Sequence, residues 1–397
     1  MINRKSTTSI FSLWQKPLLL LFSGLLSVTS NEAIANPNTQ KAIPGTFRVE
    51  TIATGFLAPW GMAFVNSHEL VITERIGTVK ILNPDTGTII SLTGVPAVLA
   101  DGQGGLMDVA VSPDYPDTRK LYFTYTKMVN GQGVTTLAIA TREGNRLSHW
   151  HDLIVTDSGT NTGRHFGSRI AFDQQGHIFF SVGDRGERPH AQNTSNHAGS
   201  ILRLNLDGSI PKDNPFLNRK GYRAEIWSYG HRNPQGLVFD VKTGRLWAIE
   251  HGPRGGDELN LIEKGRNYGW PIISYGKEYW GPIAVGEGTA KVGMEQPRKV
   301  YIPSIAPSGL MVYQGDAFPD WKGNLFTGAL KLTHLNRIVL SDEGIPVAEE
   351  RLLDDMNERI RAIAQGPDGL IYFSTDSGKI ARLKPTGIHV WEKNISN

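Results

Sequence analysis

The stretch GSRIAFDQQGHIFFSVGDRG, residues 167–186, reads as two short apolar strands joined by a Gln-Gly turn. Apolar residues alternate or run together on both sides of the turn, which is typical of a β-hairpin with buried faces. The same pattern recurs in other parts of the chain. The further segments are PWGMAFVNSHELVITER (59–75), GLMDVAVSPDYPDTRKLYFTYT (105–126), NPQGLVFDVKTGRLWAIEHG (233–252), PSGLMVYQGDAFPDWKGNLFTGAL (307–330) and RAIAQGPDGLIYFSTDSG (361–378).

Another short strand follows several of these hairpins. The clearest examples are SILRLNLDG (200–208), LNRIVLSDEG (335–344) and GKIARLKP (378–385). Three or four strands per unit, in six units, predict an all-β chain folded as a six-bladed β-propeller with four-stranded antiparallel blades, over residues 40–390. The segment RVETIATG (48–55) is expected to pair with the last unit and close the ring. A pair of β-sandwiches is the alternative, but it does not explain the recurrence.

The composition agrees with this class of fold. The chain has 397 residues, 44 of them glycine, and 20% are charged, which suits a turn-rich globular β protein better than a helical or disordered one. Cysteine is absent, which excludes disulfides and thiolate metal sites.

The first 35 residues have the features of a secretory signal peptide. Arg4, Lys5 and Lys16 precede the apolar run PLLLLFSGLLSV, and Ala-Ile-Ala at 33–35 offers a cleavage site before Asn36. The apolar run is too short to span a bilayer comfortably, so we expect cleavage rather than an anchor. The predicted product is a single exported domain, residues 36–397, located in the periplasm and not inserted in the membrane.

Net charge argues against nucleic acid as a partner. Residues 1–35 carry three cations and Glu32, a net of +2, so their removal takes the formal charge from +3 to +1. A nearly neutral chain has no bulk electrostatic reason to bind nucleic acid or an anionic membrane. Any local cluster of cations therefore needs its own explanation.

Unusual polar residues occur where the first strand of a hairpin begins and where its second strand ends. These two points lie at the same end of a hairpin, so in a ring of hairpins the residues converge on one face around the axis. Those before first strands are Gln103, His165, His231, Arg232, Asn233, Arg359 and Arg361. Those after second strands are Asp184, Arg185, Lys331 and the run HGPRGGDE at 251–258.

Each of these residues alone has an ordinary structural explanation, such as an ion pair at a blade edge. Together, the cations Arg232, Lys331, Arg359 and Arg361 would repel one another in one pocket unless an anion lay between them. We therefore expect a polyanionic ligand, held by charge-assisted hydrogen bonds. Gly252-Pro253 lacks one amide donor and leaves carbonyl oxygens free, which suits a hard cation such as Ca²⁺, although Gly-Pro by itself is a weak metal signal.

Several motifs, in this order, resemble the soluble quinoprotein glucose dehydrogenases and their periplasmic aldose sugar dehydrogenase relatives. The motifs are GQGGL, RHFGSR, GDRG, GHRNPQGL, EHGPRGGDELNLIEKGRNYGWP, PSIAPSG and RIRAIAQGPDG. The resemblance covers nearly the whole of the chain after residue 35, and the run at 250–271 and GHRNPQGL are its most specific parts. It implies a six-bladed propeller that carries pyrroloquinoline quinone (PQQ) and Ca²⁺ on its axis.

The resemblance also implies roles for individual residues, carried over by motif. His165 matches the general base and Gln103 the residue beside quinone and substrate. The matches to cofactor-holding positions are Arg232, Asn233, Lys331, Arg359 and Arg361. Gly252 and Pro253 match the carbonyl ligands of the active-site Ca²⁺, and Asp257, Glu258 and Tyr268 match positions linked to further Ca²⁺ sites.

The implied activity is oxidation of the anomeric hydroxyl of an aldose to a lactone, with electrons passed to an acceptor that the sequence does not identify, by a monomer or a homodimer. Arg164 stands where glucose dehydrogenases have an acidic residue, and YIPS at 301–304 lacks their tryptophan. An aldose is therefore implied, but not glucose in particular. The rivals are a Ca²⁺-dependent lactonase or esterase, which needs several axial carboxylates or amides, and a propeller that only binds proteins.

Overall fold

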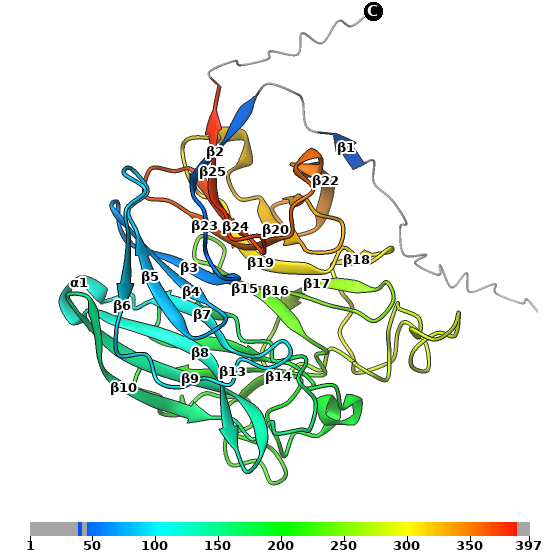
Figure 1. Cartoon of the computed structure of the whole chain (residues 1–397). Helices are drawn as coiled ribbons and strands as arrows, with labels where there is room; N and C mark the ends of the chain where they lie inside the picture. Colours follow the sequence, from blue (N-terminus) through cyan, green and yellow to red (C-terminus); the bar gives the residue numbers. More distant parts are fainter. Residues whose placement is uncertain (1–38, 42–45, 387–397) are drawn as a thin grey trace, which may run out of the picture. The chain divides into compact units, whose positions relative to one another are not determined.

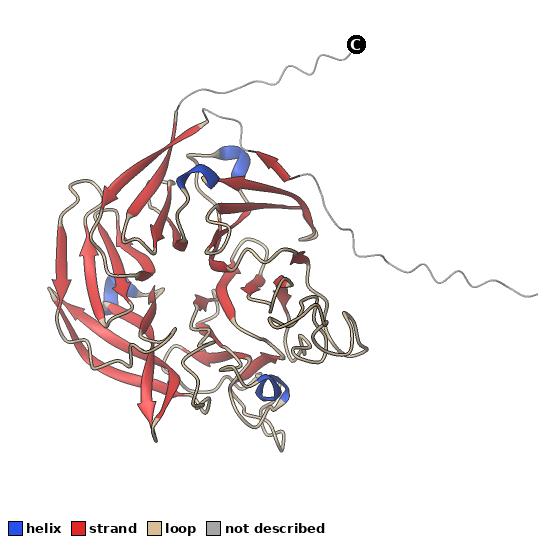
Figure 2. Cartoon of the chain, turned by 45° about the vertical axis from the view of Figure 1, so that its right-hand side comes forward, coloured by secondary structure: helices blue, strands red, loops and turns tan. Residues whose placement is uncertain are grey.

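Six sheets account for nearly all the regular structure, in a computed structural model that describes residues 39–41 and 46–386 (Figure 1). The sheets are arranged around a central axis (Figure 2). The predicted six-bladed β-propeller with four-stranded antiparallel blades is confirmed. The predicted signal peptide, residues 1–35, lies outside the described residues.

Three blades contain the first half of the propeller, and in each the strands follow chain order from the axis outward. The first blade consists of β3 (Pro59–Asn66), β4 (Glu69–Glu74), β5 (Thr78–Leu82) and β6 (Ile89–Leu92). The second consists of β7 (Leu106–Val111), β8 (Lys120–Val129), β9 (Gln132–Glu143) and β10 (Arg146–Val155). The third consists of β11 (Ile170–Phe172), β12 (His177–Val182), β13 (Ser200–Asn205) and β14 (Ile226–Tyr229).

The other three blades complete the ring. The fourth consists of β15 (Pro234–Asp240), β16 (Arg245–Glu250), β17 (Asp257–Ile262) and β18 (Lys299–Tyr301). The fifth consists of β19 (Pro307–Val312), β20 (Leu325–Ala329), β21 (Leu335–Leu340) and β22 (Pro346–Leu352), to which β1 (Thr39–Lys41) adds a parallel strand. The sixth consists of β23 (Ile360–Gln365), β24 (Ile371–Thr375), β25 (Ile380–Pro385) and β2 (Phe47–Ala53).

The ring closes by pairing the two ends of the described chain. Strand β2 pairs antiparallel with β25, with Val49 opposite Leu383, as expected for the segment 48–55. The first strand of every blade also contacts the first strand of the next, all the way round from β3 to β23 and back to β3. The inner strands therefore form a continuous wall around the axis.

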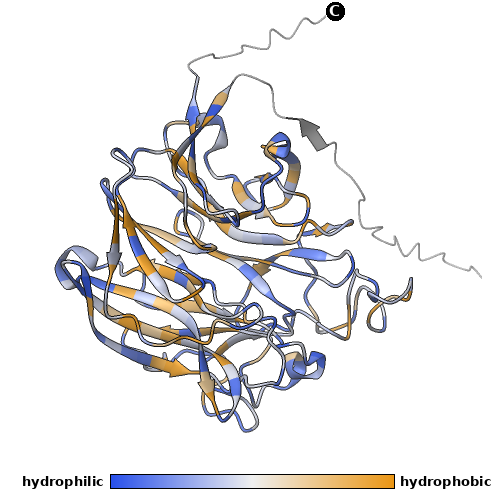
Figure 3. Ribbon diagram, viewed as in Figure 1, coloured by the Kyte–Doolittle hydropathy of each residue, from blue (hydrophilic) through white to orange (hydrophobic). Residues whose placement is uncertain are grey.

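Apolar side chains fill the spaces between neighbouring blades. Successive residues of a strand point to opposite faces, so Leu70 and Ile72 of β4 pack toward the sixth blade while Val71 packs toward the second. Tyr122 and Phe123 of β8 divide in the same way between the third and first blades. Neighbouring blades thus cover both faces of a strand such as β4 or β8. This explains why such strands contain nearly continuous runs of apolar residues, whereas other strands mix apolar and polar residues (Figure 3).

Helices are few and short in the described part of the chain. They are α1 (Tyr115–Thr118) and the 3₁₀ turns η1 (Arg188–Gln192), η2 (Pro319–Trp321) and η3 (Asp354–Met356). None of the helices in residues 39–41 and 46–386 has the length and apolarity needed to cross a membrane.

Candidate active site

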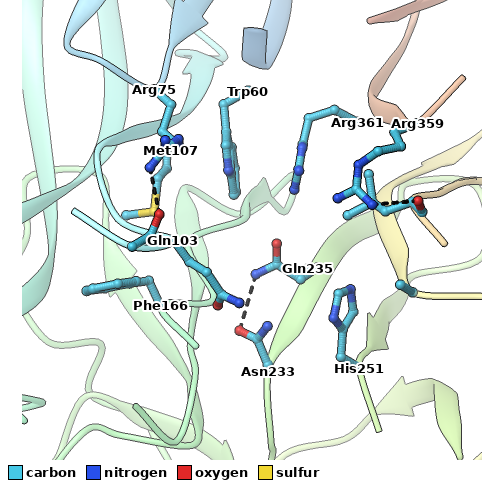
Figure 4. Close-up of a pocket in the computed structure, with 13 residues that line it drawn as sticks. Trp60, Arg75, Gln103, Met107, Phe166, Asn233, Gln235, His251, Arg359 and Arg361 are labelled. Carbon is cyan, nitrogen blue, oxygen red and sulfur yellow. Dashed lines mark hydrogen bonds between the residues drawn. The ribbon is translucent and has the colours of Figure 1, made fainter. Parts of the chain in front are cut away.

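A cavity of about 240 Å³ opens where the inner strands begin (Figure 4). Four of the predicted site residues line it: Gln103, Asn233, Arg359 and Arg361. The remaining lining residues are Trp60, Arg75, Gly102, Met107, Phe166, Gln235, His251, Ala306 and Leu330. His165, Arg232 and Lys331 are not among its lining residues, so the structure brings together only part of the predicted set at this cavity.

The hairpin register explains why residues from hairpin ends come together. In the third blade Ile170 of β11 lies opposite Phe180 of β12, so the residues before β11 sit beside those after β12. The position immediately after the second strand, or one residue beyond it, carries an ionisable residue in five blades. These residues are Arg75, Asp184, His251, Lys331 and Asp376.

His165 is held by a buried carboxylate. Its Nδ1 lies 2.6 Å from Oδ1 of Asp184, whose Oδ2 accepts a hydrogen bond of 2.7 Å from the indole of Trp270. Asp184 also accepts a bond of 2.7 Å from the backbone of Gly186. Burial alone would raise the pKa of Asp184, but the hydrogen bond and charge of His165, with Arg232, outweigh burial and lower it. An ionised Asp184 can only accept, so His165 carries its proton on Nδ1 and its Nε2 lone pair is free.

The environment of His165 favours the neutral imidazole. Burial is the largest cause and lowers its pKa, the hydrogen bond that His165 donates to Asp184 opposes this, and the positive charge of Arg232 lowers the pKa further. The residue also adopts a left-handed backbone, with φ of 57°, which is uncommon outside glycine. The imidazole ring of His165 is thus neutral near neutral pH, and its orientation is fixed.

The loops that carry Gln103 and His165 interlock. The backbone N–H of Gln103 donates to Gly163 at 2.7 Å, and the N–H of His165 donates to Oε1 of Gln103 at 2.8 Å. A Cβ on Gly102 would lie 2.2 Å from the carbonyl oxygen of Gly163, so only glycine permits this approach. Because Oε1 is occupied, the amide nitrogen of Gln103 is the group left for a ligand.

Arg359 and Arg361 share one carboxylate, which corrects the expectation that only a ligand could relieve the repulsion between the cations. Arg361 binds both oxygens of Asp376 at 2.9 Å, and Nε of Arg359 binds Oδ2 at 2.8 Å. Burial would raise the pKa of Asp376, but the two guanidiniums outweigh it and hold the pKa below its usual range. One carboxylate against two guanidiniums leaves positive charge in excess.

The other predicted cofactor-holding residues differ in their surroundings. Arg232 is nearly buried, donates to the carbonyl of His251 at 3.1 Å and lies over the ring of Trp270. Asn233 accepts through Oδ1 from Gly167, at 3.2 Å, which leaves its amide nitrogen for a ligand. Lys331 is exposed, and its ammonium forms no ion pair with any residue in 46–386.

A second, narrower cleft of about 10 Å³ shares His251 with the large cavity. That volume is close to what one water molecule requires, so it suits an ion and not an organic ligand. Gly252 and Pro253 line the cleft, and their carbonyl oxygens accept no hydrogen bond from the described residues. Arg232, Glu258 and Tyr268 line it as well.

The three residues expected at further metal sites have distinct surroundings. Both oxygens of Asp257 are occupied, since Oδ1 accepts from Gly252 at 2.9 Å and Oδ2 accepts from Ala306 at 2.8 Å. Tyr268 uses its hydroxyl to donate to Leu261 and to accept from Glu263. Asp257 therefore fixes the Gly252 loop, and Tyr268 could reach an ion only through its backbone carbonyl.

Glu258 is the carboxylate that remains for a cation. Burial, together with the negative charge of Glu250, raises the pKa of Glu258 to about 8. The amide nitrogen of Asn260 donates to Glu250 at 3.1 Å and to Glu258 at 3.3 Å, and its buried Oδ1 has no partner in the described structure. Glu250 is already held by His231, at 3.0 Å, and by the backbone N–H groups of Arg232 and Asn233, so Glu258 is the carboxylate left for a hard cation.

Sequence reasoning missed the floor of the cavity. The guanidinium of Arg169 donates to Gln235 at 2.7 Å and to Arg361 at 3.1 Å, pairs with Asp108 at 3.2 Å, and lies over the ring of Trp60. One buried side chain thus connects the inner strands beneath the cavity. Arg185, expected at the open face, is instead fully buried and stacks on Phe166.

Comparison with known proteins gives a consistent result along the chain. The family model described as "Glucose / Sorbosone dehydrogenase" matches residues 56–382. Aldose sugar dehydrogenase YliI of Escherichia coli (strain K12) is 40% identical over 357 residues, covering 87% of this chain and 94% of that protein. Quinoprotein glucose dehydrogenase B of Acinetobacter calcoaceticus is 27% identical over 441 residues, covering 89% and 90%.

A solved structure shows the same architecture with a cofactor named. The PQQ-bound form of an aldose sugar dehydrogenase from Streptomyces coelicolor superposes with a TM-score of 0.72 at 28% identity. The match covers 86% of this chain and 99% of that one.

Proposed function

Because the chain belongs to the glucose/sorbosone dehydrogenase family, we propose that it oxidises the C1 hydroxyl of aldose sugars to lactones with PQQ and Ca²⁺. Relatives along most of its length are named as sugar dehydrogenases, and the chain is an enzyme of this quinoprotein type. The position of oxidation, the metal and the residue roles are our proposal. The observation that carries it is the His165–Asp184 pair beside a cavity lined by cations.

The large cavity fits a flat tricarboxylate such as PQQ. Excess positive charge at Arg359 and Arg361, with Arg232 and Lys331 nearby, would bind its carboxylates by charge-assisted hydrogen bonds. The amide nitrogen of Asn233 adds a neutral donor. When bound, PQQ supplies a quinone that accepts hydride from the sugar, and these cations favour its reduced, more negative form.

His165 acts as the general base in this proposal. The free Nε2 takes the proton of the C1 hydroxyl while the hydride leaves C1, so the carbonyl of the lactone forms and His165 becomes an imidazolium. Asp184 then stabilises this cation through the hydrogen bond to Nδ1. Gln103 offers its amide nitrogen to an oxygen of the substrate or cofactor.

The narrow cleft fits Ca²⁺. The free carbonyls of Gly252 and Pro253 would be the ligands nearest the large cavity, where a bound Ca²⁺ supplies a Lewis acid. Glu258 would bind a further ion as a carboxylate, which it becomes when the cation displaces its proton, with Tyr268 contributing through its backbone. Asp257 supports the site indirectly, because its oxygens already hold Gly252 and Ala306.

The geometry disfavours the hydrolase alternative. A lactonase or esterase of this shape needs several carboxylates around one metal on the axis, whereas Asp184 and Asp376 are each committed to His165 and to two arginines. Across residues 46–386, no three His, Asp or Glu side chains come together as a metal site. A propeller that only binds proteins would not need cations and a base around one cavity.

Two further parts of the proposal concern the cell. We propose that residues 1–35 direct export to the periplasm and are removed before Asn36. Mass spectrometry of protein made in a Gram-negative host checks this, and an intact N-terminus in the membrane would contradict it. Arg164 replaces an acidic residue of the glucose dehydrogenases beside the base, so aldoses other than glucose belong in the substrate panel.

The test is reconstitution. Apoprotein mixed with PQQ and Ca²⁺ should show a shifted visible spectrum and reduce an artificial electron acceptor when an aldose is added. The matching methyl glycoside has no C1 hydroxyl and should be inert, and deuterium at C1 should slow turnover. Hydrolysis of lactones without PQQ, or oxidation of the glycoside, would contradict the proposal.

A further inference from the structure

Arg75 lines the large cavity but belongs to none of the motifs that predicted the site. It follows β4 directly, as Asp376 follows β24, and Asp184 lies one residue further from the end of β12. Figure 4 shows Arg75 and the Arg359–Arg361 pair on different sides of the cavity, with Trp60 between them.

The guanidinium of Arg75 is only partly satisfied. Its Nη1 donates to the carbonyls of Gly102 at 2.7 Å and Gly104 at 3.1 Å, the two residues that flank Gln103. Nε and Nη2 have no partner, and the side chain forms no ion pair anywhere in residues 46–386. The adjacent Glu74 is occupied by Lys80, at 2.8 Å.

The backbone of Arg75 is fixed in place. Its N–H donates to Ala58 at 3.2 Å, and its carbonyl accepts from Leu106 at 3.0 Å. Gly105 has a φ of 146°, and a Cβ there would lie 2.0 Å from the carbonyl oxygen of Arg75. The backbone of Arg75 is therefore held at the cavity, and its guanidinium cannot move away through a shift of the loop.

Arg75 thus differs from the opposite pair. Asp376 offsets part of the charge of Arg359 and Arg361, while nothing described offsets Arg75. We propose that Arg75 is a further anion-binding residue, whose Nε and Nη2 bind a carboxylate of PQQ while Nη1 stays on the Gln103 loop. This inference rests on the cofactor in the proposed function.

A plain structural role is the competing explanation. Arg75 could serve only to hold the Gln103 loop, in which case its loss would weaken every ligand of the cavity to the same extent. Direct contact with a carboxylate would instead weaken an anionic ligand more than a neutral one. PQQ and its trimethyl ester provide this pair of probes, since they share a ring system and differ in charge.

The experiment measures dissociation constants of PQQ and of the trimethyl ester for full-length apoprotein by fluorescence titration. In the wild type, PQQ should bind more tightly than the ester. Arg75→Gln should weaken PQQ about ten- to a hundred-fold, as expected for one charge-assisted hydrogen bond, with a much smaller effect on the ester. Arg75→Lys keeps the charge without the planar fork and should fall between the two.

The controls separate the ways in which the inference could fail. Arg146→Gln, which removes an exposed charge on the outer strand β10, should change neither constant. Thermal unfolding of each apo variant checks folding, and Arg75→Lys carries the test if Arg75→Gln does not fold. An equal loss for PQQ and ester would make Arg75 a loop clamp and overturn the inference. A wild type that binds no PQQ would overturn the proposed cofactor as well.

Discussion

The two hollows on either side of His251 differ in size and in charge. The larger, about 240 Å³, is lined by the guanidinium groups of Arg75, Arg359 and Arg361 and by amide groups. The smaller, about 10 Å³, is lined by the carboxylates of Glu250 and Glu258 and by free backbone carbonyls, with the guanidinium of Arg232 also in its wall. One suits an organic anion and the other a metal cation. Placed together, the two ligands would neutralise each other's charge and the charge of their own walls.

The residue between the hollows has little charge of its own. Burial lowers the pKa of His251 to about 3, against a hydrogen bond to the carbonyl of Pro307 that raises it, and Arg232 lowers it further. Since Nε2 donates to that carbonyl at 2.6 Å, the imidazole stays neutral and fixed. Because His251 is neutral, it adds no charge to either hollow.

The largest expected effect concerns His165, beside the basic cavity. His165→Ala should reduce kcat about 10²–10⁴-fold, because a positioned base contributes that much, while PQQ still binds. Steady-state kinetics with an aldose and an artificial acceptor, beside PQQ titration, measure both. The exposed His68→Ala is the matched control. A kcat within a few-fold of wild type would remove His165 from the base role.

The acidic cleft should respond to a different substitution. Glu258→Gln keeps the shape of the side chain but cannot ionise to bind a cation, so Ca²⁺ affinity measured without PQQ should fall about 10- to 100-fold. Added Ca²⁺ should then raise the melting temperature of the variant less than that of the wild type. An unchanged Ca²⁺ affinity would show that Glu258 is not a ligand. Asp257→Asn would disturb the Gly252 loop and is not a clean substitute.

The repeat explains how much of this site could be predicted. His165, Gln103 and Arg359 were found because they precede first strands in recognisable motifs, and Arg361, in the same motif as Arg359, lies at the start of β23. Asp184 was noticed after a second strand, and its pairing with His165 follows from the hairpin register. The fold was predictable for the same reason, since each hairpin carries its own turn and apolar pattern.

Residues that depend on contacts between blades were not predictable in this way. Asp376 and Arg75, like Asp184, lie just after the second strand of a hairpin. A comparison of the residues at the ends of the second strands in all six units would have found them. Arg169 gives no local signal, because its partners lie on inner strands of other blades. Arg185 was misplaced because a polar residue at a loop can turn inward when backbone carbonyls satisfy it, as those of Gly133 and Thr162 do here.

The charge pairing at Arg361 changes the expected stability of the apoprotein. Arg361→Gln should weaken PQQ about ten- to a hundred-fold. The repulsion argument alone would have the apo variant melt at or above wild type, whereas loss of the two bonds to Asp376 should make it melt below. Asp376→Asn should also melt lower. Calorimetry of apo forms checks the sign, and a higher melting temperature for Arg361→Gln would restore the view that repulsion dominates.

The smallest effect is a shift in pH dependence. A base must be neutral to act, and the pKa of His165 is lowered from 6.5, so kcat/KM should be flat near neutral pH and fall only at lower pH. Arg232 is the larger of the two cationic causes of that lowering, ahead of Arg164. Removing its charge should therefore raise the pKa of His165 and move the acid limb of the profile toward neutral pH.

The titration can be followed without cofactor, by NMR of the His165 ring in apoprotein. Arg232→Gln should raise the midpoint, Arg164→Gln should raise it less, and Lys331→Gln should leave it unchanged, since Lys331 is not among the causes of the shift. If Arg232→Gln left the midpoint in place, burial alone would account for the neutral base. The charge of Arg232 would then act on a bound ligand and not on the protonation of His165.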